Sequence, residues 1–217
     1  MLRLMIYQRT TYRFNMKREF RKVGHKYCLG DERIPSVTEI IQPLTDYGNI
    51  PPAILKNAAD FGTHVHDMIA LWLSGDLCED TLDVGLKRPL EGFIAWYEVI
   101  KKYAGSPVSV EKWFGDRRLK YAGTPDLVFG DRIFDIKTRA VNPAVDSLQL
   151  EAYRQLVGKQ SSPIKISPTA VYVLHIDPDG LCKTTQVYNK QAWGMFRKLL
   201  EHRKNLELIE NWKGKRR

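Results

Sequence analysis

The chain has 217 residues, 43% of them hydrophobic and 27% charged, as is typical of a globular domain with a core of its own. No apolar run approaches the roughly 20 residues that a membrane helix needs, and three widely spaced cysteines argue against a disulfide framework and against a zinc site of the Cys-x-x-Cys type. The net charge of +9 favours a polyanionic partner such as nucleic acid, with a solvated basic surface as the alternative.

Residues 1–24 are rich in arginine and lysine and are expected to form a basic extension to a single domain, which spans residues 25–217 and ends in a long helix. The extension has no long apolar stretch and no small-residue cleavage site, so we expect no signal peptide. Its acid-poor, arginine-rich composition leaves an organellar transit peptide as the minor alternative. Cysteines without disulfide spacing favour the reducing cytoplasm.

The first elements of the domain are short. Residues 25–34 predict a small hairpin that turns at Gly30 and Asp31. Ser36 lies three residues before Glu39, which is the spacing of a capping box, and this pair predicts the start of a short helix.

Two long helices are predicted next, over residues 49–73 and 87–103. In the first, two prolines lie near the N-terminus, where a helix tolerates them. Its apolar stripe consists of Val65, Met68, Ile69, Trp72 and Leu73.

Beyond these helices the apolar period changes from that of a helix to that of a strand. The remaining elements, in chain order, are a strand at 106–114, one bent strand or two at 117–130, a strand at 132–138, a helix at 144–158, a strand at 168–176, its hairpin partner at 182–188 and a final helix at 190–212. The order of helix, three strands, helix and strand predicts an α/β fold with a mixed central sheet flanked by helices.

Asp126, Asp135 and Lys137 interrupt strands that are otherwise apolar. Asp135 and Lys137 are two residues apart, so a strand directs both side chains to one face. A tight turn at Gly130 and Asp131 returns this strand beside Asp126, which brings the two aspartates together. Adjacent buried carboxylates repel each other, and a hard divalent cation such as Mg²⁺ or Mn²⁺ relieves the repulsion. The alternative is a structural ion pair between Asp135 and Lys137 on an exposed strand face.

Further motifs surround these residues in a fixed order. GTPD at 123–126 is followed after eight residues by DIKT at 135–138, while FGTHVH lies upstream at 61–66 and LQLEAYRQL lies downstream at 148–156. Together they resemble the motifs of the RecB-like exonuclease branch of the PD-(D/E)XK phosphodiesterase superfamily. IPSVTEII at 34–41 is similar to a segment common in phage members. The resemblance covers roughly residues 25–190 and implies a restriction-endonuclease-like core of the order α-β-β-β-α-β.

The resemblance implies a role for each residue that matches a motif. Asp126 and Asp135 would be metal ligands at the catalytic site, and Lys137 would be the catalytic lysine. The backbone carbonyl of Ile136 and the side chain of His66, from the preceding helix, would complete the metal site.

Three more residues are implied in supporting roles. Gln149 and Tyr153 lie one helical turn apart and would contact the DNA backbone or orient the site. Glu111 lies where relatives often carry a glutamate and would support the metal or a water molecule. The plainer alternatives are a surface glutamine, a packing tyrosine and a glutamate paired with cations across the sheet.

The choice of histidine rests on the motif alone. His64 and His66 flank the apolar stripe on opposite sides, so helical periodicity does not decide between them. Trp72, Trp113 and Trp193 could stack on bases, with core packing as the alternative for each.

The resemblance implies a divalent-metal-dependent deoxyribonuclease, most similar to exonucleases that act on linear single- or double-stranded DNA, and located in the bacterial cytoplasm if a phage encodes it. The alternatives are a structure-specific or restriction-type endonuclease on the same core, and a non-catalytic DNA-binding module. Three dispersed cysteines cannot hold the four-cysteine iron–sulfur cluster of some relatives, so we expect no cluster. Without a G-x-x-x-x-G-K-[ST] loop, any helicase, recombination or replication partner would be a separate protein.

Overall fold

A computed structural model describes residues 19–23, 26–45, 48, 50–159 and 168–214 of the chain. Residues 1–18 of the predicted extension lie outside this range. Among the described residues, no helix combines the length and apolar composition needed to cross a bilayer.

The fold is built on a mixed sheet of five strands in the order β10-β9-β8-β7-β4. These strands are β4 (Ser109–Val110), β7 (Leu127–Val128), β8 (Arg132–Lys137), β9 (Ala170–Ile176) and β10 (Cys182–Gln186). The neighbours β8 and β9 run parallel, whereas the other three neighbouring pairs are antiparallel. A parallel pair needs a long crossover, and helix α5 (Pro143–Gly158) lies within it. A mixed central sheet flanked by helices is therefore confirmed.

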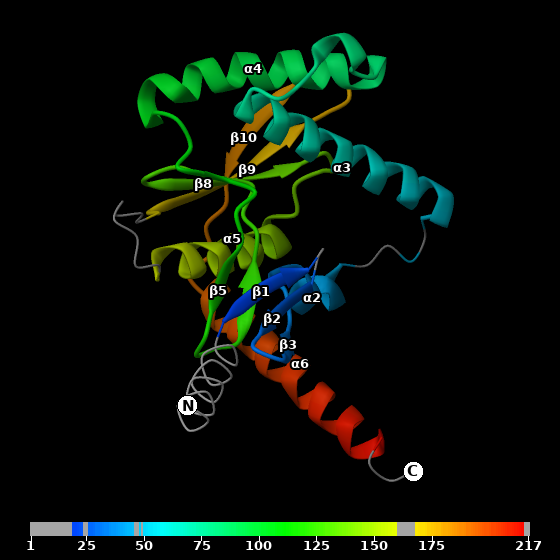
Figure 1. The fold of residues 1–217 in the computed structure, drawn as a ribbon, viewed down its shortest axis with the longest axis vertical. Helices are drawn as coiled ribbons and strands as arrows, with labels where there is room; N and C mark the ends of the chain where they lie inside the picture. Colours follow the sequence, from blue (N-terminus) through cyan, green and yellow to red (C-terminus); the bar gives the residue numbers. More distant parts are fainter. Residues whose placement is uncertain (1–18, 24–25, 46–47, 49, 160–167, 215–217) are drawn as a thin grey trace, which may run out of the picture.

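Helices cover both faces of this sheet. They are α3 (Pro52–Ser74), α4 (Val84–Ala104) and α5 (Pro143–Gly158). In Figure 1, α3 and α4 lie on one side of the sheet and α5 lies on the other. The alternation of side chains along β8 serves both layers, because Phe134 and Ile136 pack in the cluster with α3 and α4, whereas Ile133 packs in the cluster with α5.

The other half of the molecule contains smaller elements and the last helix. They are β1 (Phe20–Val23), β2 (Lys26–Leu29), β3 (Glu32–Ile34), α2 (Val37–Ile41), the 3-10 turn Gln42–Leu44, β5 (Phe114–Asp116), β6 (Tyr121–Gly123) and α6 (Ala192–Gly214). A second 3-10 turn, Glu79–Thr81, connects α3 to α4. The strands β1, β2 and β3 form one antiparallel sheet, while β5 and β6 form another. Figure 1 shows α6 running from the body of the molecule toward the C-terminus.

The hairpin and the capping box predicted near the N-terminus are present. The hairpin β2–β3 turns at Gly30, whose φ of 64° suits glycine. Ser36 Oγ accepts a 3.0 Å hydrogen bond from the backbone N–H of Glu39, and Glu39 Oε2 accepts one of 2.8 Å from the N–H of Ser36. This reciprocal pair starts α2 at Val37.

One strand prediction and one boundary differ from the structure. The strand predicted over 106–114 is divided into β4 and β5, which belong to separate sheets, because the chain turns at Glu111 with a φ of 47°. The segment 117–130 forms two strands, β6 and β7, which is one of the two predicted arrangements, and they belong to separate sheets. At the N-terminus, β1 pairs along its length with β2, so residues 20–23 belong to a sheet rather than to an extension that ends at residue 24.

Candidate metal centre

The two strands that carry Asp126 and Asp135 meet in the register that their spacing predicts. Leu127 pairs with Phe134, so the preceding residue Asp126 lies beside Asp135 on the neighbouring strand. Asp126 Oδ2 accepts a 2.6 Å hydrogen bond from the backbone N–H of Ile136. Both aspartates are buried, with only 1% of Asp135 exposed. The hairpin therefore buries two carboxylates at the end of the central sheet.

Lys137 lies on the same face of β8 as Asp135, as their spacing predicts. Its Nζ is 2.5 Å from Asp135 Oδ2, but no hydrogen bond of good geometry from the described residues reaches that oxygen. The lysine side chain is 15% exposed and the aspartate side chain 2%. An exposed structural ion pair, the alternative interpretation of these residues, does not describe this geometry. A buried carboxylate oxygen without a hydrogen bond has unused capacity for a cation.

Helix α3 brings His66 to the end of this hairpin. His66 Nε2 lies 3.2 Å from the backbone oxygen of Ile136, and Nδ1 lies 3.4 Å from Asp126 Oδ1. The helix approaches closely at Gly62, where a Cβ atom would lie 3.2 Å from Thr138 Oγ1, just beyond Lys137. His64, the competing histidine, is exposed on the same helix.

Glu111 completes the group from the turn between β4 and β5. Its Oε1 lies 3.2 Å from His66 Nδ1, and its backbone N–H donates a 2.9 Å hydrogen bond to the carbonyl oxygen of Asp126. The φ of 47° at Glu111 is uncommon for a residue with a side chain. Such strain persists only where the surroundings enforce it, and it is concentrated at functional sites.

The donor set fits a divalent cation. One ligand atom from each of His66, Glu111 and Asp126 lies within 4.8 Å of the other two. The Ile136 carbonyl also faces the imidazole. Carboxylate and carbonyl oxygens suit Mg²⁺, and an added imidazole suits Mn²⁺ as well.

The charges around His66 show how strongly this group of oxygens attracts a cation. Burial would lower the pKa of His66, but the charges and hydrogen bonds of Asp126 and Glu111 outweigh burial and raise it to about 11. Burial would likewise raise the pKa of Asp126, yet His66, Lys137 and the N–H of Ile136 hold it below its ordinary value. The two carboxylates therefore favour a positive charge at this position.

Burial also acts on the pKa values of Asp135 and Lys137. Burial raises the pKa of Asp135 to about 6 against the opposing charge of Lys137, and the charge of Asp126 adds to the increase. Burial would lower the pKa of Lys137, but Asp135 and Asp126 reverse the shift and raise it. Lys137 is therefore held as an ammonium ion beside the carboxylates.

Gln149 and Tyr153 lie on the buried face of α5, behind this site. Gln149 Nε2 donates a 3.1 Å hydrogen bond to the Tyr153 hydroxyl. Burial raises the pKa of Tyr153 well above its ordinary value, and the charges of Asp135 and Asp126 add to the shift. The pair therefore stays neutral next to the carboxylates, which is compatible with orienting the site.

Residues that carry no motif also reach the site. Tyr27 OH lies 2.6 Å from Thr124 Oγ1, and Lys22 Nζ lies 3.3 Å from the same oxygen. Thr124 precedes Asp126 by two residues. No local pattern joins Tyr27 to Thr124, which is 97 residues away in the chain.

A second group anchors the segment that follows Lys137. Asp146, fully buried in the first turn of α5, forms an ion pair with Arg139 and accepts a 2.7 Å hydrogen bond from the backbone N–H of Asn142. The chain between β8 and α5 is therefore held close to the end of the hairpin. The sequence does not predict this ion pair. An aspartate such as Asp146 in the first turn of a helix is already favoured by the helix dipole, with or without an arginine partner.

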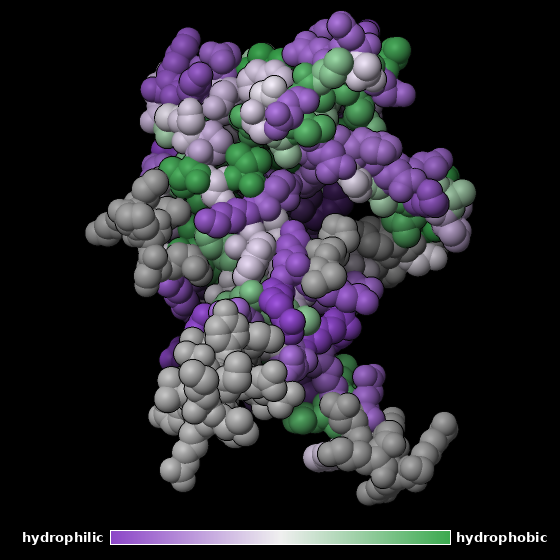
Figure 2. All heavy atoms as spheres, viewed as in Figure 1, coloured by the Kyte–Doolittle hydropathy of each residue, from purple (hydrophilic) through white to green (hydrophobic). Residues whose placement is uncertain are grey.

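The molecular surface beside α3 is hollowed. Figure 2 shows a recess beneath α3, with hydrophilic residues facing it. His66 lies on α3, and its side chain is 29% exposed, while that of Glu111 is 37% exposed. The cluster is therefore open to solvent through His66 and Glu111 and closed behind Asp126 and Asp135.

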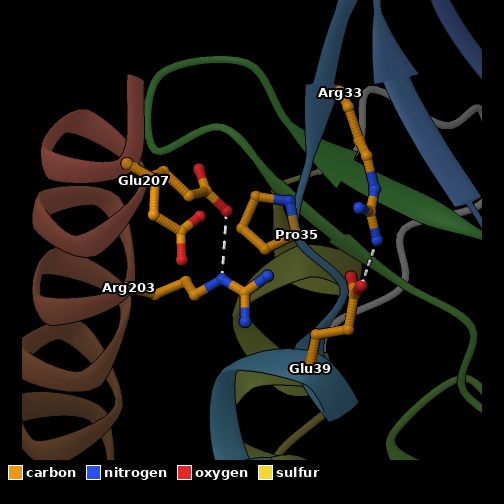
Figure 3. A pocket seen from close by; sticks show the side chains of 6 residues that line it. Arg33, Pro35, Glu39, Arg203 and Glu207 are labelled. Carbon is orange, nitrogen blue, oxygen red and sulfur yellow. Dashed lines mark hydrogen bonds and ion pairs between the residues drawn. The ribbon is translucent and has the colours of Figure 1, made fainter. Parts of the chain in front are cut away.

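A different hollow lies between α2, β3 and α6 (Figure 3). It has a volume of about 230 Å³ and is lined by Arg33, Pro35, Glu39, Arg203, Glu207 and Glu210. Arg33 forms an ion pair with Glu39, and Arg203 Nε lies 3.0 Å from Glu207 Oε1. Because its arginines pair with glutamates inside the hollow and the volume is below that of most ligand sites, it is the weaker candidate.

No family model matches the chain, and no curated protein matches it either. Similar solved structures include an alkaline exonuclease (LHK-Exo) from Laribacter hongkongensis, 11% identical with a TM-score of 0.38, covering 84% of this chain and 94% of that one. LHK-Exo in complex with dAMP is 11% identical with a TM-score of 0.36, covering 85% and 95%. Both neighbours are nucleases, but a TM-score below 0.5 is too low to assign this chain's fold or function.

Proposed function

We propose that this protein is a divalent-metal-dependent deoxyribonuclease of the PD-(D/E)XK type that hydrolyses phosphodiester bonds at the ends of linear DNA. One observation carries the proposal: ligand atoms of His66, Glu111 and Asp126 converge beside the buried pair of Asp135 and Lys137. A structural role would be satisfied by the ion pair alone and would not need three further ligands around it.

His66, Glu111, Asp126 and Asp135 would hold Mg²⁺ or Mn²⁺ together with the carbonyl of Ile136. The bound ion would lower the pKa of a water molecule and stabilise the charge that develops on the phosphate. The protein supports this by orienting its ligands, because the N–H of Ile136 fixes one oxygen of Asp126 and leaves the other directed toward His66. Ligands held in advance need no reorganisation during the reaction.

Lys137 is the proposed catalytic lysine. Asp135 and Asp126 keep it protonated, and its contact with Asp135 restricts where its Nζ can lie. An ammonium ion held at the edge of a carboxylate cluster can donate to a phosphate oxygen or orient the attacking water. Gln149 and Tyr153, joined by a hydrogen bond, support the strand end from α5.

DNA is the proposed substrate because the chain carries a net charge of +9 although its candidate site is acidic. An acidic site can bind a phosphate only when a cation occupies the site. A positive surface around the site would hold the DNA backbone. An exonuclease is favoured over a structure-specific endonuclease only by the resemblance of the motifs, so the experiment must distinguish the two.

The test is a digest of end-labelled linear DNA beside closed circular DNA of the same sequence, in Mg²⁺, Mn²⁺ or EDTA. We expect release of nucleotides from linear DNA only with metal, and loss of that activity in Asp126→Ala and Lys137→Ala. Asp67→Ala, an exposed carboxylate on α3, is the matched control.

Each of the other outcomes selects a different function. Circular DNA cut as fast as linear DNA would identify an endonuclease. Tight DNA binding without cleavage under any metal would identify a non-catalytic binding module. Activity that persists in both site variants would place the chemistry elsewhere in the protein.

A further inference from the structure

The sheet β1–β3 reaches the end of the hairpin that carries the candidate metal ligands Asp126 and Asp135. Tyr27 OH and Lys22 Nζ both contact Thr124 Oγ1, at 2.6 Å and 3.3 Å. Thr124 precedes Asp126 by two residues, so these groups contact the segment that carries Asp126. Lys22 is exposed, and Thr124 is half-buried. A hydroxyl and an ammonium ion near a metal site can bind a phosphate.

Aromatic rings continue the same surface. Trp113 follows Glu111 by two residues, and its ring lies 5.8 Å from that of Phe20 and 6.4 Å from that of Tyr27. Gly115 makes room for Phe20, because a Cβ atom there would lie 2.6 Å from the ring. Phe20 and Trp113 are only half-buried, so these two rings keep part of their surface in solvent.

Trp72 and Trp193, the other tryptophans that could have stacked on bases, pack against core residues. The ring of Trp72 lies 5.8 Å from that of Phe93, and the ring of Trp193 lies 5.9 Å from that of Phe196. Phe93 and Phe196 are fully buried. Trp113 also packs against a buried ring, that of Tyr27, but this smaller core cluster belongs to the sheet β1–β3, which contacts Thr124.

Cations border these rings. Lys22 Nζ lies 5.9 Å from the centre of the Tyr27 ring, and the Arg117 guanidinium lies 5.6 Å from the centre of the Phe20 ring. One nearby acid, Asp116, is buried and forms an ion pair with Lys159 at 2.7 Å. The surface formed by Phe20, Lys22, Tyr27, Trp113, Arg117 and Thr124 is here termed the aromatic ledge. It carries two cations, Lys22 and Arg117, and borders the acidic side chain of Glu111.

We propose that the aromatic ledge binds the unpaired DNA strand that leads to the metal cluster. This inference rests on the proposed function and specifies its substrate as single-stranded DNA near the cut. Lys22 and the Thr124 hydroxyl contact a backbone phosphate, and Trp113 stacks on a base. Positive charge interleaved with aromatic rings is the composition that binds unpaired strands, because every base has a face that can stack. A duplex presents free base faces only at its ends.

The experiment measures binding of a fluorescein-labelled oligothymidylate by fluorescence anisotropy in EDTA, beside a blunt duplex and an oligouridylate of the same length. We expect wild-type protein to prefer the DNA single strand. Trp113→Leu should weaken its binding by about 5-fold or more, the loss of one stacked base. Lys22→Ala should reduce the slope of log affinity against log salt by about 0.7, the loss of one phosphate contact on a single strand.

Lys102→Ala and Tyr103→Leu are the matched controls, because both residues are exposed at the end of α4, which Figure 1 places in the other half of the molecule. Circular dichroism melting checks that each variant is folded. Wild-type affinity in both ledge variants would overturn the inference, as would equal affinity for the duplex. Tighter binding of oligouridylate would overturn the assignment to DNA.

Binding in EDTA is independent of metal chemistry, so the two proposals fail separately. Single-strand binding that depends on Trp113 and Lys22, without degradation of DNA by wild-type protein, would reject the nuclease and keep the ledge. Metal-dependent degradation by wild-type protein, with binding that neither substitution alters, would reject the ledge and keep the nuclease.

Discussion

Asp126 and Ile136 are joined by a 2.6 Å hydrogen bond from the backbone N–H of Ile136 to Asp126 Oδ2. The bond crosses between the two strands of the hairpin and fixes the orientation of a carboxylate whose other oxygen lies 3.4 Å from His66 Nδ1. One oxygen therefore holds the side chain in place, and the other faces the candidate cation site. An amide oxygen at position 126 could still accept the bond, so Asp126→Asn removes the charge with little change to the hairpin.

The first prediction concerns metal binding. Mn²⁺ or Mg²⁺ should raise the melting temperature of the wild-type protein, because a ligand that binds only the folded state stabilises it, by about 2.7 kcal/mol at about 100 times the Kd. Asp126→Asn should remove most of this increase. Thermal melting with and without metal, after treatment with EDTA, measures the effect.

The matched control is Asp67→Asn, which changes an exposed carboxylate one residue from His66. Its melting temperature should increase with metal as that of the wild type does. An increase of the same size in Asp126→Asn would show that the cation binds elsewhere.

The second prediction separates the two histidines of α3. His66→Ala should lower metal affinity by at least about 10- to 100-fold, because loss of a group that merely orients a ligand already costs that much. His64→Ala should retain the wild-type affinity, since its side chain is exposed while that of His66 lies among Glu111, Asp126 and Ile136. Titration of Mn²⁺ by isothermal calorimetry compares the two. The assignment of His66 is wrong if His64→Ala shows the larger loss.

The sequence predicted the relation between Asp126, Asp135 and Lys137 because strand periodicity and a tight turn are local properties. Once Gly130 and Asp131 return the chain, the register places the carboxylates on neighbouring strands and Lys137 on the face of Asp135. Neither the turn nor the pairing needs information from distant segments.

Other parts of the site depend on distant contacts that no local pattern encodes. Glu111 lay within a segment predicted as one continuous strand, because its neighbours are apolar in alternation, and its positive φ is set by packing rather than by residue type. The contact between Tyr27 and Thr124 joins segments 97 residues apart. Periodicity could not choose between His64 and His66, because the choice depends on where α3 passes the end of β8.

The third prediction concerns Gly123, the glycine of the GTPD motif. A Cβ atom there would lie 2.6 Å from the Tyr153 ring and 2.9 Å from Val37 Cγ2. Gly123→Ala should therefore lower the free energy of unfolding by about 1–3 kcal/mol, the usual effect of an overpacked core. It should also displace Tyr153 and disturb its hydrogen bond to Gln149. Urea unfolding measures the first effect.

The matched control for Gly123 is Gly130→Ala, because a Cβ atom at Gly130 would meet nothing within 4 Å. Its free energy of unfolding should stay near that of the wild type. Equal stability of both variants would mean that Tyr153 and Val37 can move away from position 123 without loss.

The last prediction concerns pH and Asp116, which is not among the candidate metal ligands. Burial would raise the pKa of Asp116, but Lys159 and the backbone N–H groups of Leu119 and Arg118 outweigh burial and hold it below its ordinary value of 3.8. A carboxyl group whose pKa is lower in the folded state contributes stability above its unfolded pKa, and the contribution is lost as the pH falls through the folded value. Asp116→Asn should therefore lower the free energy of unfolding by about 1–2 kcal/mol at about pH 7, and the difference from the wild type should shrink at about pH 3 and below.

Urea unfolding at several pH values measures this difference, with the exposed Asp76→Asn as the matched control. A difference that is the same at neutral and acidic pH would show that Lys159 and the two N–H groups do not favour the charged form of Asp116.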